Sequence, residues 1–249
     1  VQYRKKHYVA EATTVIVAGN FDEKQVQKEI QKAFGPISKS KKQKKIKVKD
    51  TQTEPQVLVE ARKTDQAHMV LGVRGFPAGH AHNPTIRMLN AVLGAGMSSR
   101  LFQKLREEMG VGYYVRSSYD TYTDHGIFSV SIGADVTRVE EVVNAIIAEL
   151  KRFTVELVSK EELLKTQEYL IGMMYLGLES SDSIAEFYGY QEILRQKLKT
   201  PQEIVKEIRS VTPENIRAMA KKLFLNKNLN LAIVGPEQDT KKLKQLLKF

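Results

Sequence analysis

The sequence of 249 residues contains no cysteine, which excludes disulfides, thiol nucleophiles and metal sites with thiolate ligands. Its absence does not define the compartment, although we favour the cytoplasm. No run approaches the roughly 18 consecutive apolar residues of a spanning helix, so we expect no membrane partner. The chain starts at Val1 without a basic and then apolar leader, which fits a cleaved precursor or a fragment of a longer protein.

Positive charge is concentrated in one segment. The net charge is +10, an excess that invites a nucleic-acid or acidic-membrane partner. Residues 39–49 (KSKKQKKIKVK) contain seven lysines, however, which leaves +3 for the rest of the chain. Gly and Pro before this run, and polar sequence with Pro after it, predict an exposed linker over 39–53. The run has no interleaved aromatics, so we expect no nucleic-acid partner; binding of acidic ligands is a weaker alternative.

The apolar patterns predict an α+β fold, with a mixed or antiparallel sheet and helices packed on one face. The expected strands are residues 13–18, 56–60, 68–73, 113–119, 126–133 and 229–234. The expected helices start at Asp22, after Asn83-Pro84, at Ser98, and at several points between Asp135 and Phe224, with capping-box patterns at Ser159 and Thr200. Strands that precede a long helical run favour a single layer of sheet under a helical layer.

An internal repeat divides the chain. Residues 3–20 (YRKKHYVAEATTVIVAGN) align without a gap with residues 219–236 (MAKKLFLNKNLNLAIVGP), at an offset of 216. A repeat unit of that size leaves one complete unit and the tail of another. We therefore predict that residues 1–38 are the final strand and helix of a truncated first domain and that residues 54–249 are a complete C-terminal domain.

No motif for helix-borne zinc binding occurs, because the sequence lacks HxxEH and has no histidine pair four residues apart on a helix. His80 and His82 are the closest pair, in a Gly/Pro-rich loop that indicates solvated side chains. Ser98-Ser99 lacks the GxSxG context of a nucleophile and suits a helix cap. Gly94-Ala95-Gly96 could bind an anion through its amides, but a helix break is the preferred interpretation.

The segment from Leu93 to Val115, LGAGMSSRLFQKLREEMGVGYYV, resembles the second-domain signature of the pitrilysin/insulinase family of zinc metallopeptidases. The opening HYVAEATTVIVAGNFD, the segment SKEELLKTQEYLIGMM and the closing LAIVGP also fit. The resemblance implies a half-domain of the mitochondrial-processing-peptidase type. In that family HxxEH and a distant Glu ligand lie in the first domain, so the chain resembles the C-terminal domain, which binds no zinc.

The resemblance carries over two site residues. The family has an Arg and a Tyr seven residues apart, with Gly before the Tyr, and these match Arg106 and Tyr113. The implied roles are gripping of a peptide carbonyl by Arg106 and donation by the Tyr113 hydroxyl to the oxyanion formed during hydrolysis. A salt-bridging surface arginine and a half-buried core tyrosine are the plainer alternatives. Tyr114 is a rival, expected on the opposite strand face.

The resemblance implies the substrate-binding C-terminal domain of a zinc metalloendopeptidase, with a peptide or small protein as substrate. The zinc of the intact enzyme would lie on the missing N-terminal domain, so this chain is expected to bind no metal and to be inactive alone. The alternative is a non-catalytic partner or scaffold subunit of the same family. Its partner would be the missing domain or another subunit, including a second copy in a homodimer.

Overall fold

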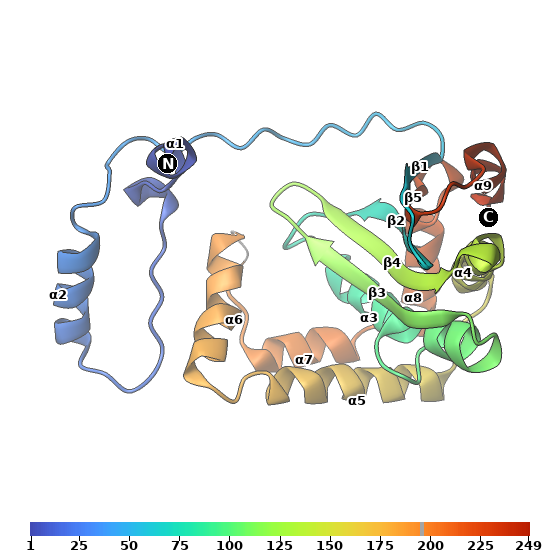
Figure 1. Ribbon diagram of the computed structural model, residues 1–249. Helices are drawn as coiled ribbons and strands as arrows, with labels where there is room; N and C mark the ends of the chain where they lie inside the picture. Colours follow the sequence, from blue (N-terminus) through green and yellow to red (C-terminus); the bar gives the residue numbers. More distant parts are fainter. Residues whose placement is uncertain (195–196) are drawn as a thin grey trace.

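The computed structural model describes residues 1–194 and 197–249, and its core is a five-stranded mixed sheet (Figure 1). The strand order is β1-β5-β2-β4-β3; β1 runs parallel to β5, and the other neighbours are antiparallel. The strands are β1 (Gln56–Ala61), β2 (Gln66–Gly75), β3 (Gly112–Thr121), β4 (Gly126–Asp135) and β5 (Asn230–Gly235). The α+β class and the mixed sheet are therefore confirmed.

Helices cover one face of this sheet and leave the other face open. On β2, alternate residues such as Met69 and Leu71 are buried, whereas His68 and Val70 on the other face are exposed. The covering helices are α3 (Asn83–Gly94), α4 (Val139–Val155) and α8 (Pro213–Leu223), with α5 (Lys160–Leu176) and α7 (Pro201–Arg209) beneath α3 and α9 (Thr240–Leu246) beside β1. Helices on a single face were predicted, and the structure confirms them. No described helix is long and apolar enough to cross a membrane.

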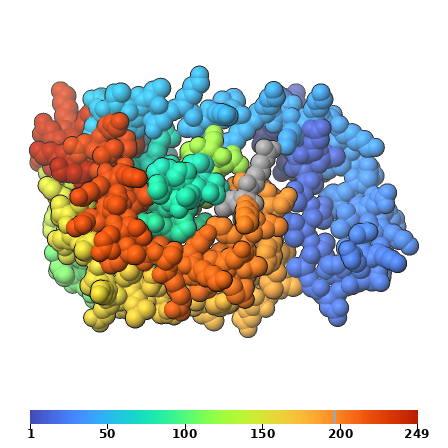
Figure 2. Space-filling view, turned by 180° about the vertical axis from the view of Figure 1, so that it is seen from behind, coloured from blue at the N-terminus to red at the C-terminus, as the bar shows by residue number. Residues whose placement is uncertain are grey.

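The first 38 residues lie apart from the sheet, at the end of the molecule beyond α6 (Ser181–Ile193) (Figures 1 and 2). They form α1 (Gln2–His7), the 3-10 turn η1 (Ala10–Ala12) and α2 (Glu23–Phe34). The predicted strand over 13–18 is wrong: the segment is extended but belongs to no strand ladder of the described chain. A strand needs a hydrogen-bonding neighbour, and this segment lies instead against α6.

The lysine-rich connection, residues 39–53, contains no helix or strand but is fastened to the sheet. The Lys45 Nζ and the Val48 N–H both donate to the Asp124 carboxylate in the β3–β4 turn, at 2.6 and 3.0 Å. Further along, Asp50 pairs with Arg74 at the end of β2, at 3.2 Å. The connection therefore follows a defined path over the hairpin end of the sheet (Figure 1).

The predicted helix starts hold with one exception. Asp22 caps α2, Thr200 forms a complete capping box with Glu203, and the Ser159 hydroxyl accepts from the Glu162 N–H. The cap prediction for Ser98 is wrong, because the next helix begins at Arg100. The turn before it uses Gly96 at a φ of 86° and one residue more than predicted, so Ser99 precedes the helix and its hydroxyl donates to the Gly96 carbonyl.

Candidate functional site

The structure brings Arg106 and Tyr113 together through the main chain. Arg106 lies on the π-helical segment η2 (Phe102–Glu108), and a short turn with Gly110 at a φ of 62° leads from it into β3. The Arg106 Nη1 donates to the carbonyl oxygen of Tyr113 at 2.5 Å and to that of Gly112 at 3.4 Å. Arg106 has no ion pair among the described residues; besides the start of β3, its guanidinium contacts the Phe102 ring, 5.8 Å from the ring centroid.

Tyr113 occupies a bulge in β3. In the ladder with β4, Gly112 pairs with Ala134 and Tyr114 pairs with Gly133, which leaves Tyr113 without a partner. A bulge bends the strand and redirects a side chain. Tyr113 is 69% exposed, so the alternative of a half-buried core tyrosine is wrong. The prediction that Tyr114 lies on the opposite face assumed regular alternation, which the bulge interrupts.

Tyr114 is joined to His68 across the sheet. Their rings are stacked with an interplanar angle of 18°, and the Tyr114 hydroxyl lies 3.3 Å from the His68 Nδ1. The two residues belong to β3 and β2, with β4 between them. Gly133 is the residue of β4 that separates them, and its missing side chain leaves room for the tyrosine ring. Sequence reasoning missed this contact, although a glycine inside a strand can signal such a close approach.

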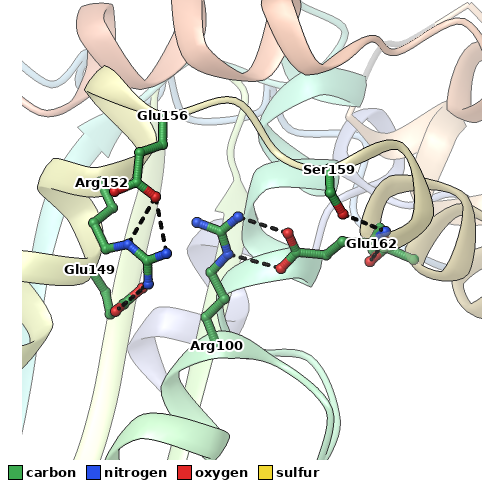
Figure 3. A network of polar contacts seen from close by, with 7 residues as sticks. Arg100, Glu149, Arg152, Glu156, Ser159 and Glu162 are labelled. Atoms are coloured by element: carbon green, nitrogen blue, oxygen red, sulfur yellow. Dashed lines mark hydrogen bonds and ion pairs between the residues drawn. The ribbon is translucent and has the colours of Figure 1, made fainter.

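Arg100 fastens the start of this helical region to α5. Its Nε and Nη2 donate to the two carboxylate oxygens of Glu162, at 2.8 and 2.7 Å (Figure 3). The guanidinium also lies over the Phe153 ring, 4.5 Å from its centroid. A bidentate pair with a stacked aromatic restricts the position of an arginine strongly. The base of η2 is thereby held, and with it the helical turn that carries Arg106.

Gly94 lets α3 approach β3 closely. A Cβ at this position would lie 2.6 Å from the Ser117 nitrogen and 2.5 Å from its Oγ. The Ser117 hydroxyl in turn donates to the Asn90 carbonyl of α3 at 2.9 Å. This glycine therefore serves the packing of the helix on the strand, in line with the preferred helix-break interpretation of 94–96.

The open face of the sheet has an apolar hollow. Leu58, Val70 and Ile127 are 68%, 45% and 38% exposed on it, and Gly72 lies beside them on β2. Together with their neighbours these residues line a shallow space of about 530 Å³. Large exposed apolar patches are typical of surfaces that contact another molecule or domain.

The residues described here do not fit a zinc ion. His80 and His82 have ring centroids 5.0 Å apart, but the His80 Nδ1 accepts the His82 N–H, and both rings pack on Phe76. Burial lowers the pKa of His82. No group of three or more His, Cys, Asp or Glu side chains that could hold a metal occurs within the part of the chain that the structure describes.

Comparison with known proteins gives consistent matches. The family model for the peptidase M16 inactive domain matches residues 1–170. The chain is 32% identical over 238 residues to the uncharacterized zinc protease YmxG of Bacillus subtilis, a match that covers 94% of this chain and 56% of that protein. The chain thus spans about half the length of the curated relatives that it matches.

Two solved structures share the fold. A protease from Helicobacter pylori superposes with a TM-score of 0.79 at 17% identity, and the match covers 88% of this chain and 54% of the protease chain. A peptidase M16 inactive domain from Pseudomonas fluorescens superposes with a TM-score of 0.78 at 16% identity and covers 88% and 53%. At such low identity these likenesses concern the fold alone.

Proposed function

The chain belongs to the peptidase M16 inactive domain family. We propose that it is the substrate-binding half of a peptide-hydrolysing protein and that Tyr113 and Arg106 contact the substrate. The observation that carries this proposal is the exposed Tyr113 in a bulge held by Arg106. An exposed tyrosine whose main chain is already held in place is suited to contact a ligand, because binding costs little additional conformational entropy.

We propose that the Tyr113 hydroxyl donates a hydrogen bond to the carbonyl oxygen of the bond to be cleaved. A phenol is a neutral donor at pH 7, and one such donor contributes roughly 2.7–4 kcal/mol to stabilising the developing negative charge. Arg106 would have two tasks. Its Nη1 holds the bulge, and since a guanidinium has five N–H groups, others can bind a second peptide carbonyl.

The outer edge of β3 offers a place for the peptide main chain. β3 is the last strand in the sheet order, and Tyr113 lies at its start. Extended peptides commonly bind by adding a strand to such an edge. A peptide on this edge would pass directly beside the bulge, which supports the assignment of Tyr113 as the contact to the substrate.

Zinc, which the names of the curated relatives imply, would be held outside this chain. We expect the pure chain neither to bind zinc nor to cleave peptides. Peptidase activity of the pure chain that a chelator abolishes would overturn this expectation. The linker 39–53 would then connect the domain 54–249 to the part that holds the metal.

The decisive test of the tyrosine uses a peptidase-active protein or complex that contains this chain. Tyr113→Phe should lower kcat about 10²–10³-fold, because one donor to the developing charge is lost, while the zinc content stays unchanged. Tyr122→Phe, at the exposed far end of the hairpin, is the matched control and should retain the normal rate. A normal rate in Tyr113→Phe would refute the role of the phenol.

The second candidate is a non-catalytic partner or scaffold subunit that supplies Arg106 and Tyr113 to another chain. The description of the matched model as an inactive domain is consistent with it. Reading the gene upstream of Val1 discriminates the two functions. HxxEH there supports the two-domain enzyme, and a domain without it supports the partner subunit.

A further inference from the structure

Three neighbouring strands hold the Tyr114 ring in one place. Tyr114 pairs with Gly133 of β4, and Gly133 pairs with His68 of β2, so the three residues form one row across the sheet. A Cβ on Gly133 would lie 2.7 Å from the Tyr114 Cε1, so only glycine leaves this path open. At the end of the path the phenol meets the His68 Nδ1 at 3.3 Å. The row therefore sets the position of the hydroxyl.

The tautomer of His68 decides what this hydroxyl can offer to a ligand. If Nδ1 carries a proton, the imidazole donates to the phenolic oxygen, and the phenolic hydrogen is left to point at another acceptor. If Nδ1 carries no proton, the phenol donates its hydrogen to the imidazole and has none left for a ligand. The first arrangement turns Tyr114 into an oriented donor on the open face.

Arg116 brings a positive charge to the same face. It lies two residues beyond Tyr114 on β3, about 7 Å along the strand, and pairs with the short Ser131 of β4. Among the ion pairs of the described residues Arg116 has none, and Asp120, the next carboxylate of β3 on this face, is about 13 Å further along.

We propose that Arg116 and the His68-oriented Tyr114 form a subsite for a carboxylate of the bound peptide, either an acidic side chain or the C-terminal carboxylate. A carboxylate accepts from a guanidinium and from a neutral hydroxyl at once, and hydrogen bonds with an ionised partner are about twice as strong as neutral ones. The subsite rests on the proposed peptide-binding function. His68 is a positioning residue, since it acts through Tyr114.

The binding experiment uses the 249-residue chain and fluorescein-labelled, unstructured 15-residue peptides in matched sets. One pair differs by Glu or Gln at a central position, and the other by a C-terminal acid or amide. We expect about tenfold tighter binding of the carboxylate member in at least one pair, and the pair that responds identifies the source of the carboxylate. Equal affinities in both pairs overturn the subsite but leave peptide binding intact, whereas absence of all peptide binding overturns the proposed function as well.

Matched variants separate the subsite from the general positive charge of the chain. Arg116→Gln and Tyr114→Phe should each remove most of the preference for the carboxylate. Arg62→Gln removes the same formal charge from an arginine paired with Glu60, and it should retain the preference. An equal loss in Arg116→Gln and Arg62→Gln would show that only net charge matters and would overturn the subsite.

Two further measurements test the positioning role of His68. Gly133→Ala leaves all three polar groups in place but displaces the Tyr114 ring, so it should reduce the preference as far as Tyr114→Phe does. NMR of the imidazole nitrogens should show a proton on the His68 Nδ1 whose signal shifts in Tyr114→Phe; this readout does not depend on Gly133→Ala folding. A bare Nδ1 in the peptide-bound chain would overturn the assignment of Tyr114 as donor.

Discussion

Residues 2–12 and 218–228 have the same helix end and the same 3-10 turn in two different surroundings. The helix α1 ends at His7, and α8 ends at Leu223. The residue that follows each helix has nearly the same backbone angles: φ and ψ are −92° and 79° at Tyr8 and −89° and 80° at Phe224. A 3-10 turn follows in both copies: η1 (Ala10–Ala12) and η4 (Asn226–Asn228), at the offset of 216. A helix capped by an aspartate, Asp22 for α2 and Asp239 for α9, follows each of these segments.

The two copies differ in what lies beside them. β5 is hydrogen-bonded on both sides, by β1 and β2, whereas the matching residues 14–19 have no strand beside them in the described chain. Ile233 is 1% exposed, and its counterpart Val17 is 44% exposed. The comparison shows that local sequence signals decide helices, turns and caps, whereas a strand forms only where a neighbouring strand is available for hydrogen bonding.

The largest expected contrast is in hydrogen exchange. The β5 amides should exchange at least about 10³-fold more slowly than those of 14–18, because only β5 is protected by a sheet that must unfold. Mass spectrometry of the deuterated chain measures both segments in one sample. If the proposed N-terminal domain of a longer protein provides a sheet for residues 14–18, these residues should be protected in that protein too. Slow exchange of 14–18 in the isolated chain would contradict the difference between the copies.

A core truncation should separate the copies next. Ile233→Ala removes most of a fully buried side chain, and the free energy of unfolding of this variant should be lower by about 2–5 kcal/mol. Val17→Ala, the matched change in the first copy, should alter that free energy by no more than about 0.5 kcal/mol. Urea unfolding of both variants measures the two values. A similar loss in both would mean that the first copy is packed into the core.

The helix caps should give a smaller contrast. The Asp239 side chain accepts from two backbone N–H groups of α9, whose Leu243 is buried, so Asp239→Ala should lower the free energy of unfolding by about 1 kcal/mol. Asp22→Ala removes the cap of α2, which buries no residue, and should reduce helical circular dichroism without moving the main urea transition. A shift of that transition would connect α2 to the core.

The smallest effect concerns the contact that ties the lysine-rich connection to the β3–β4 turn. Lys45, the Val48 N–H and His125 hold the pKa of Asp124 well below its usual 3.8. A carboxylate with a lowered pKa stabilises the contact above that usual value and loses it as the pH falls through the lowered pKa. The NMR shift of the Val48 amide should report this loss in acid. Asp124→Asn should also speed tryptic cleavage within 39–49 at pH 8, whereas Asp120→Asn should not.

Most of the fold was predictable because its signals are local. The capping box at Thr200, the Asp22 cap and the alternation of β2 each depend on residues a few positions apart. The strand over 13–18 was wrong for the complementary reason. Its β-branched residues suit a sheet, but no local pattern states whether a neighbouring strand is present.

The candidate site divides in the same way. The seven-residue spacing of Arg106 and Tyr113 pointed to a pair, and the structure adds how they meet, through the carbonyl of Tyr113. The bulge at Tyr113 depends on the register between β3 and β4, which the sequence of β3 alone does not reveal. The contact of Tyr114 with His68 joins residues 46 positions apart and needs Gly133 between them.

The sequence by itself determined most of the helices, the caps at Asp22, Ser159 and Thr200, and the repeat, because each arises from short-range hydrogen bonds and apolar spacing. Only the tertiary structure decided that β5 is a buried strand while residues 14–19 are not, and that Tyr113 leaves the ladder while Tyr114 crosses it. Strand pairing and register are contacts between distant segments, and their free energy comes from the neighbour that each strand finds.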